Sequence, residues 1–130
     1  MIHHALYIQA SPPRGRGVFT NEAIPEHTML EIAPVIVMSQ ADRLHLDQTR
    51  LHDYIFEWGP DQSQCCMALG QIPIYNHSSA SNAEYFMDYE QELMFIKSVR
   101  PIQAGEEITI NYNGDWNDTK PVWFDQQDPA

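Results

Sequence analysis

The sequence predicts a single domain built mainly from short β-strands. Stretches rich in β-branched and aromatic residues recur along the chain, and turns that contain glycine or proline separate them. Only one stretch carries the cap and spacing of a helix, so the pattern does not fit a Rossmann fold, in which strands alternate with long helices. A length of 130 residues fits one compact unit with a modest core, and a hydrophobic fraction of 43% is typical of a folded globular protein.

The first part of the chain is expected to hold strands at residues 5–10, 18–20 and 29–38. A loop at 11–17 separates the first two, because it contains two prolines and two glycines. Pro34, in the third strand, indicates an edge position or a bend. Ser39 then caps a short helix that carries Asp42 in its first turn and ends near Gln48.

The second part is expected to hold strands at residues 54–58, 65–69, 82–89, 93–99 and 107–112. The first two pair as a hairpin that turns after Gly59-Pro60, and the next two pair as a hairpin joined at Glu90-Gln91. A turn at 100–105 leads into the last strand. The whole pattern predicts small sheets with one or two short helices.

The net charge limits which partners the protein can bind, and the cysteines indicate its cellular compartment. The formal net charge of −11 repels a phosphate backbone, so no direct nucleic-acid partner is expected, whereas a lysine-rich peptide would be attracted. Acidity of this size also serves solubility alone. Cys65 and Cys66 are adjacent and ill placed to bridge, which predicts a reduced, intracellular protein, cytoplasmic or nuclear. No apolar run is long enough to span or enter a membrane.

Three separated motifs stand in one order along the chain: Gly15-Arg16-Gly17-Val18-Phe19, then Tyr-Asn-His-Ser-Ser-Ala-Ser-Asn at residues 75–82, then Gly-Glu-Glu-Ile-Thr-Ile-Asn-Tyr at residues 105–112. This order and spacing resemble the SET-domain protein-lysine methyltransferases over about residues 4–115. The small stand-alone form is similar to viral and bacterial members. The resemblance implies a β-clip fold with a knot-like C-terminal crossing, a SET domain at 1–115 and a tail at 116–130.

The resemblance implies an S-adenosylmethionine site and a catalytic Tyr112. It assigns cofactor binding to Arg14, Gly15, Arg16, Gly17, Tyr75, Asn76 and His77. Taken alone, these residues have plainer interpretations: the glycine pair makes a tight turn, His77 is a buried histidine bonded to the backbone, and Tyr112 packs its ring. The resemblance implies a structural role for Glu107, which holds the knot-like C-terminal crossing together.

Methyl transfer to lysine requires an uncharged amine. The ordinary pKa of a lysine is ~10.4, so the amine must lose its proton in a narrow apolar channel that disfavours the ammonium. Aromatic walls suit such a channel because they accept the lysine stem and tolerate its cation. The resemblance places Tyr85 and Ile110 at the channel, with a bias toward low methylation states. Tyr54 and Trp116 are further channel candidates. Tyr54, Tyr75 and Trp58 are either wall residues or core.

Several positions depart from the family pattern without removing a group that performs the transfer. Ser79 replaces a usual Cys, Ser81 a usual Pro, and Asn111 a common Asp. No cysteine follows Cys66, so the tail cannot build the thiolate zinc site of many relatives, and no metal is predicted. Trp116 and other apolar tail residues either form a lid over the channel or pack against the domain.

Two classes of function remain open from the sequence. The first is a lysine methyltransferase acting on a histone tail or on another basic protein, such as a ribosomal protein. The second is a non-catalytic SET-like module that binds a peptide or protein. A homodimer that completes the binding groove is one expectation for a chain of this size. The sequence identifies neither the target lysine nor the number of methyl groups added.

Overall fold

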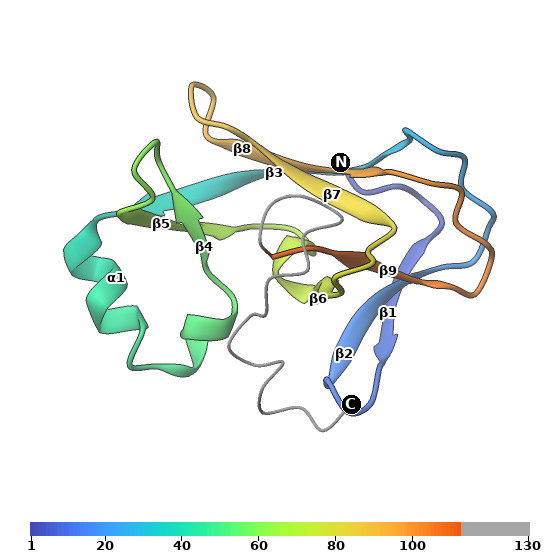
Figure 1. Ribbon diagram of the computed structural model, residues 1–130, viewed down its shortest axis with the longest axis horizontal. Coiled ribbons are helices and arrows are strands. Elements are labelled where there is room, and N and C mark those ends of the chain that lie inside the picture. The colour runs from blue at the N-terminus through green and yellow to red at the C-terminus, as the bar shows by residue number, and fades with distance from the viewer. Residues whose placement is uncertain (113–130) are drawn as a thin grey trace.

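The computed structural model describes residues 1–112, and it is mainly β, as the sequence predicts. Its strands form two sheets, in the orders β1-β2-β9-β6 and β4-β5-β3-β8-β7 (Figure 1). The element bounds are β1 Leu6–Ala10, β2 Arg16–Thr20, β3 Met29–Met38, α1 Gln40–Leu46, η1 Arg50–Asp53, β4 Phe56–Trp58, β5 Gln64–Ala68, η2 Ile72–Ile74, β6 Asn76–His77, β7 Ala83–Asp88, β8 Leu93–Ser98 and β9 Glu107–Ile110.

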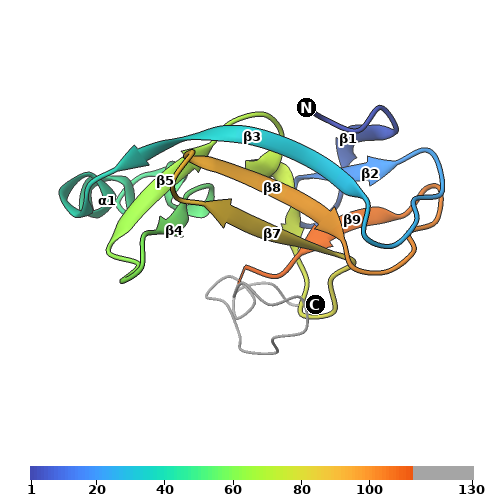
Figure 2. The ribbon, with the colours of Figure 1, turned by 90° about the horizontal axis from the view of Figure 1, so that it is seen from above.

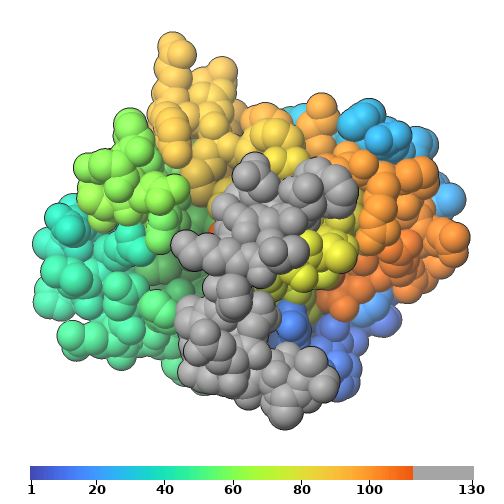
Figure 3. All heavy atoms as spheres, viewed as in Figure 1, coloured from blue at the N-terminus to red at the C-terminus, as the bar shows by residue number. Residues whose placement is uncertain are grey.

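The predicted strands and hairpins are confirmed, with ends shifted by up to two residues. β4 pairs antiparallel with β5, and β7 pairs antiparallel with β8. The tip of the β7–β8 hairpin stands out from the body at the top of Figure 3. Arg16 and Gly17, expected in the loop, are the first residues of β2 and pair with Ala10 and Gln9. The 3-10 helices η1 and η2 and the two-residue strand β6 were not predicted, since segments this short leave no periodic pattern.

The edge position suggested for Pro34 is wrong, because β3 lies between β5 and β8 in the sheet (Figure 2). Early in β3, the backbone faces the N-terminal residues: Ile32 N–H donates to Met1 O at 2.8 Å, and His3 N–H donates to Leu30 O at 2.8 Å. Beyond Pro34, that side pairs with β5. The proline therefore stands where the partner of β3 changes, and its missing N–H interrupts neither ladder.

The helix begins as predicted. The side chain of Ser39 accepts a hydrogen bond from the N–H of Asp42 at 3.1 Å, which is an N-cap. No residue of α1 is buried, and Leu44 is 62% exposed. The hydrophobic core instead lies between the inner faces of the two sheets, with fully buried side chains such as Leu30, Met94, Ile96 and Ile108.

The segment at residues 75–82 crosses β9 and is bonded to it along its length. β6 pairs parallel with β9, joining Asn76 to Thr109 and His77 to Ile110. The N–H of Ser78 donates to Ile110 O at 3.0 Å. Two stretches some thirty residues apart in sequence are thereby held together.

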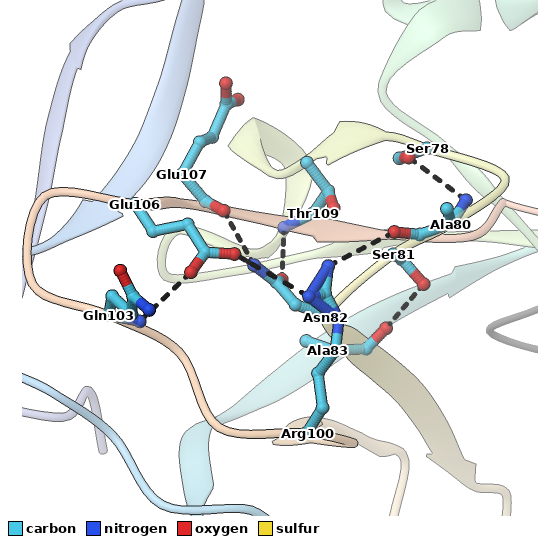
Figure 4. A network of polar contacts seen from close by, with 10 residues as sticks. All are labelled: Ser78, Ala80, Ser81, Asn82, Ala83, Arg100, Gln103, Glu106, Glu107 and Thr109. Carbon is cyan, nitrogen blue, oxygen red and sulfur yellow. Dashed lines mark hydrogen bonds and ion pairs between the residues drawn. The ribbon is translucent and has the colours of Figure 1, made fainter.

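Asn82 fastens the other end of this crossing (Figure 4). Its Nδ2 donates to Glu107 O at 2.8 Å and to the Glu106 carboxylate at 3.0 Å, and its Oδ1 accepts from Thr109 N–H at 2.9 Å. Residues two apart in a strand direct their backbone groups to the same edge, so one amide can satisfy both Glu107 and Thr109. Asn82 is only 1% exposed, so water does not compete for these groups.

Replacing Asn82 with Ala is expected to lower the free energy of unfolding by about 2–6 kcal/mol, because it leaves a buried N–H and a buried C=O unsatisfied at a cost of roughly 1–3 kcal/mol each. Urea denaturation measures the change. The matched control is Asn21→Ala at an exposed position, which should change stability by less than about 0.5 kcal/mol. Equal, small effects of the two substitutions would contradict this role of Asn82.

Candidate active site

A cleft of about 470 Å³ opens where the β1–β2 loop faces β6 and β9. This size lies within the range of roughly 300–1,000 Å³ that small-molecule sites occupy. The lining is mostly polar. It consists of Ser11, Pro12, Pro13, Arg14, Asn76, His77, Ser78, Ser79, Glu107 and Thr109.

The two glycines of the first motif have different local roles. Gly15 has a φ of +84°, a left-handed conformation that favours glycine, and a Cβ there would meet nothing within 4 Å. Gly17 has no such φ, but a Cβ would lie 2.3 Å from Glu107 Oε2 and 2.9 Å from Asn76 Nδ2. Gly17 is therefore required for the close approach of β2 to those two side chains, a role that the sequence interpretation did not include.

Glu107 joins three segments at the base of the cleft. Its Oε1 accepts from Ser11 Oγ at 2.7 Å, and its Oε2 accepts from Asn76 Nδ2 at 2.7 Å. The same Asn76 amide donates to Arg16 O at 3.1 Å. These bonds fix the orientation of the Asn76 amide in the cleft wall. The structural role expected for Glu107 is consistent with this arrangement, and the carboxylate also faces the cleft.

His77 connects the first motif with the last. Its backbone carbonyl accepts a hydrogen bond from Arg14 Nη1, and its Nδ1 accepts from the N–H of Tyr112 at 3.0 Å. Because Nδ1 accepts, the neutral ring carries its proton on Nε2. His77 is 3% exposed, and its ring centroid lies 5.3 Å from that of Tyr112. His77 therefore contacts both Arg14, in the β1–β2 loop, and Tyr112.

Tyr112 presents a protonated phenol. Burial raises the pKa of this hydroxyl well above its ordinary value, the nearby Arg14 charge opposes the rise, and Asp53 adds to it. The hydroxyl donates to the backbone carbonyl of Tyr75 at 2.5 Å. Because the hydroxyl donates its single proton to this carbonyl, its oxygen can act toward a further group only as a hydrogen-bond acceptor.

An aromatic cluster adjoins Tyr112 on another side. The ring of Phe56 lies edge-on to Tyr112, with centroids 6.1 Å apart, and 5.3 Å from the ring of Tyr85. The hydroxyl of Tyr85 donates to Tyr112 O at 3.4 Å. Phe56 was missed by sequence reasoning, which named Tyr54 and Trp58 from the same stretch.

Other predicted site residues lie elsewhere. The Tyr75 side chain is fully buried, as is Ile110, and neither lines the cleft. Trp58 is 4% exposed and packs edge-on against Tyr89. Tyr54 is 39% exposed and follows η1. Trp116 lies outside the described residues, together with the whole tail at 116–130.

Ser81 and Asn82 were also not assigned to the site from sequence. Ser81, at a position where the family usually has Pro, is fully buried and donates from Oγ to Ala83 O at 3.0 Å. Polar side chains that hydrogen-bond to the backbone in this way give no sequence signal distinct from ordinary loop residues.

In the described residues, no group of three or more His, Cys, Asp or Glu side chains is placed to hold a metal ion, and no helix is long and apolar enough to cross a membrane.

Comparison with known proteins agrees with the geometry. The model of the SET domain family matches residues 15–113. The chain is 30% identical over 128 residues to a protein of Schizosaccharomyces pombe named histone-lysine N-methyltransferase, H3 lysine-37 specific, covering 98% of this chain and 82% of that protein.

Solved structures of other proteins also resemble this chain. A Plasmodium falciparum protein described as a putative histone methyltransferase superposes with a TM-score of 0.66 at 29% identity, over 88% of this chain and 98% of that one. A Polycomb Repressive Complex 2 from Chaetomium thermophilum, in a humanized mutant form bound to the inhibitor GSK126, superposes with a TM-score of 0.68. At 20% identity, over 83% of this chain and 15% of that one, it shows the fold alone. The chain therefore belongs to the SET-domain family and is a protein-lysine methyltransferase.

Proposed function

We propose that this protein transfers a methyl group from S-adenosylmethionine to the ε-amine of a lysine in a histone, with Tyr112 orienting that amine. The observation that supports this proposal is the position of His77, which touches both the Arg14 loop at the cleft and Tyr112. A donor held in the cleft and a lysine approaching Tyr112 would meet at this residue. SET-domain methyltransferases generally use S-adenosylmethionine.

The residues of the cleft fit such a cofactor. The amino-acid part of S-adenosylmethionine carries an ammonium and a carboxylate, and the cleft wall carries Glu107 and Arg14 as groups of opposite charge. The cradle depends on the missing side chain of Gly17, because a Cβ there would collide with Glu107 and Asn76. Gly15, Arg16, Asn76 and His77 complete the proposed binding set. Bound in this way, S-adenosylmethionine supplies a methyl group on an electron-poor sulfonium.

Tyr112 is proposed to align the lysine amine rather than to deprotonate it. A phenol whose pKa burial has raised does not form a phenolate readily at neutral pH, so it is a poor general base. Because its proton is donated to Tyr75 O, the hydroxyl oxygen can act toward the amine only as an acceptor of an N–H. Such positioning can contribute several kcal/mol, against about 7–11 kcal/mol for ideal orientation.

The aromatic cluster is proposed to hold the lysine stem. Phe56, Tyr85 and Tyr112 give apolar faces that desolvate the side chain, which lowers the pKa of an ammonium and favours its loss of a proton before reaction. The Tyr85 hydroxyl narrows the space beside Tyr112, so low methylation states are favoured. Tyr54, exposed at the end of η1, is proposed to stand near the mouth of this channel.

A histone is the proposed substrate for two reasons. The S. pombe relative is named for H3 lysine 37, and the net charge of −11 attracts a basic tail. Action on histones implies a nuclear location, which goes beyond the intracellular expectation from sequence. The same field accelerates encounter with a basic peptide and is screened by salt.

A second copy of this chain is proposed as partner for the outer face of the β3–β8–β7 sheet. On that face, Phe95 of β8 pairs with Ile32 of β3 and with Phe86 of β7. The two phenylalanine rings are stacked with centroids 5.0 Å apart, and Ile36 of β3 is 52% exposed. Asp88 and Lys97 lie two residues from Phe86 and Phe95, on either side of the stacked rings, and Glu84 is the cross-strand partner of Lys97. A two-fold axis through the stacked rings would set Asp88 of one copy against Lys97 of the other.

Replacing Tyr112 with Phe should lower kcat by at least about 100-fold, since the loss of one preorganised polar group at a reacting centre costs about that much. The measurement is transfer of labelled methyl to histone H3. Affinity for S-adenosylhomocysteine, measured by calorimetry, should stay close to wild type, and the variant should remain folded with a free energy of unfolding lowered by about 1–3 kcal/mol, because the Tyr75 carbonyl loses its donor. A non-catalytic module would show no transfer by the wild-type protein, and unchanged turnover in Tyr112→Phe would exclude the proposed role of the phenol.

Labelled methyl should appear on an H3 peptide that contains lysine 37 and be absent from the same peptide with arginine at that position. Transfer at subsaturating peptide should fall as salt is raised from 50 to 500 mM, because the Debye length shortens from about 14 to about 4 Å. Equal labelling of the two peptides, or labelling only of non-histone proteins in a cell lysate, would contradict histone lysine 37 as the target.

Light scattering should find a dimer of the wild-type protein, and Ile36→Lys should shift it toward monomer by placing two like charges in the interface. The matched control is Leu44→Lys, which changes another exposed apolar residue, on α1, and should leave the dimer intact. Exchange of charges in the double variant Asp88→Lys, Lys97→Glu should preserve association. A wild-type monomer at high concentration would exclude this partner.

A further inference from the structure

Glu31 is a fully buried acidic residue that takes no part in the chemistry proposed above. It lies in β3, is 0% exposed, and burial raises the pKa of its carboxyl. Its Oε2 accepts from the N–H of Gln71 at 2.7 Å, and its Oε1 accepts from the hydroxyl of Tyr75 at 2.9 Å. A buried carboxyl is costly unless its oxygens are bonded in this way.

These two bonds hold both ends of the short helix η2. Gln71 precedes η2, and Tyr75 follows it. The approach of Glu31 to this turn depends on Gly70, which has a φ of +66° and where a Cβ would lie 2.3 Å from Oε2. The contact between β3 and η2 is therefore built around one carboxyl group.

Tyr75 carries the constraint further along the chain. Its ring is fully buried, its hydroxyl is bonded to Glu31, and its backbone carbonyl accepts the hydroxyl proton of Tyr112. The direction of that carbonyl depends on where the rest of residue 75 is held. A continuous series of contacts thus runs from Glu31 through Tyr75 to the phenol at the proposed reacting centre.

We propose that Glu31 is a positioning residue for methyl transfer, acting through Tyr75 to fix the carbonyl that orients the Tyr112 hydroxyl. The proposal rests on the function proposed for Tyr112. It assigns Tyr75 a role through its hydroxyl and its carbonyl, behind the cleft, in place of the cofactor contact that the sequence suggested.

Stability alone is a weak explanation for this pair. Replacing both members of a buried polar pair with well-packed apolar groups is often neutral or stabilising, so a stable core does not require this pair. The polar pair fixes the orientation of the Tyr75 side chain, because each hydrogen bond forms in only a narrow range of angles. The side chain of Asn76 in the cleft wall has its own bonds to Arg16 O and Glu107, so a loosened Tyr75 should mainly change the aim of the phenol.

The test compares Tyr75→Phe and Glu31→Gln with Ile72→Val. The first two remove or weaken the bond, and the third makes a small cavity in the same turn without touching the bond. We expect kcat to fall between about 10- and 100-fold in Tyr75→Phe, with a smaller fall in Glu31→Gln, while the KM for S-adenosylmethionine changes less than about twofold. The ratio of singly to multiply methylated peptide should also shift in both, and Ile72→Val should change neither.

A second measurement does not depend on turnover. In protein labelled at the tyrosine Cζ carbons, the Tyr112 resonance, assigned with Tyr112→Phe, should move in Tyr75→Phe and in Glu31→Gln but not in Ile72→Val. Wild-type kcat, product ratio and Tyr112 resonance in a folded Glu31→Gln or Tyr75→Phe protein would overturn the proposal, as would an equal effect of Ile72→Val. If the wild-type protein transfers no methyl, the proposed function fails separately, and the resonance still decides whether Glu31 acts on Tyr112.

Discussion

The crossing of residues 75–82 over β9 is the constraint on which the rest of the site depends. Asn82 bonds the backbone at Glu107 and Thr109, and β6 pairs with the same strand a few residues away. Buried backbone groups must find partners, so this segment has few alternative positions. Because the crossing is fixed, His77 lies beside Tyr112 although 35 residues separate them in sequence.

The site is assembled from short segments rather than from one element. The cleft takes its walls from the β1–β2 loop, β6 and β9, whereas the aromatic cluster takes Phe56 from β4 and Tyr85 from β7. Glu107 links the Ser11 loop to Asn76, and Arg14 links the same loop to His77. Each segment is held by polar side chains bonded to backbone or to one another. Such networks are rigid when every member is satisfied, which suits a reaction that depends on alignment.

Much of the fold could be predicted because its signals are local. A run rich in Ile and Val located β3, two apolar stretches joined at Glu90-Gln91 located the β7–β8 hairpin, and Ser39 with Asp42 located the start of α1. Pro34 was misjudged because a local rule for edge strands cannot detect a strand whose partner changes midway. The motifs brought Arg14, Asn76, His77 and Tyr112 into one neighbourhood as the resemblance implied, although their roles in binding and catalysis remain proposals.

The rest of the site could not be predicted because it depends on contacts between distant segments. Nothing in the neighbourhood of Gly17 shows that Glu107 and Asn76 occupy the space of its missing side chain. Likewise, Glu31 resembles any acidic residue in an exposed strand until the structure places it in the core against Tyr75. Phe56 and Trp58 share one face of β4, and only the position of Phe56 along that face brings it against Tyr112, whereas Trp58 packs on Tyr89. These are properties of packing and register, which local composition does not encode.

The most direct measurement is a crystal structure of the protein with S-adenosylhomocysteine and a lysine-containing H3 peptide. We expect the homocysteine group between the Arg14 loop and His77, with the lysine stem against Phe56 and its amine within hydrogen-bond distance of the Tyr112 hydroxyl. A cofactor bound away from this cleft, or a lysine that enters on a face remote from Tyr112, would contradict the central claim that the crossing builds one site from both.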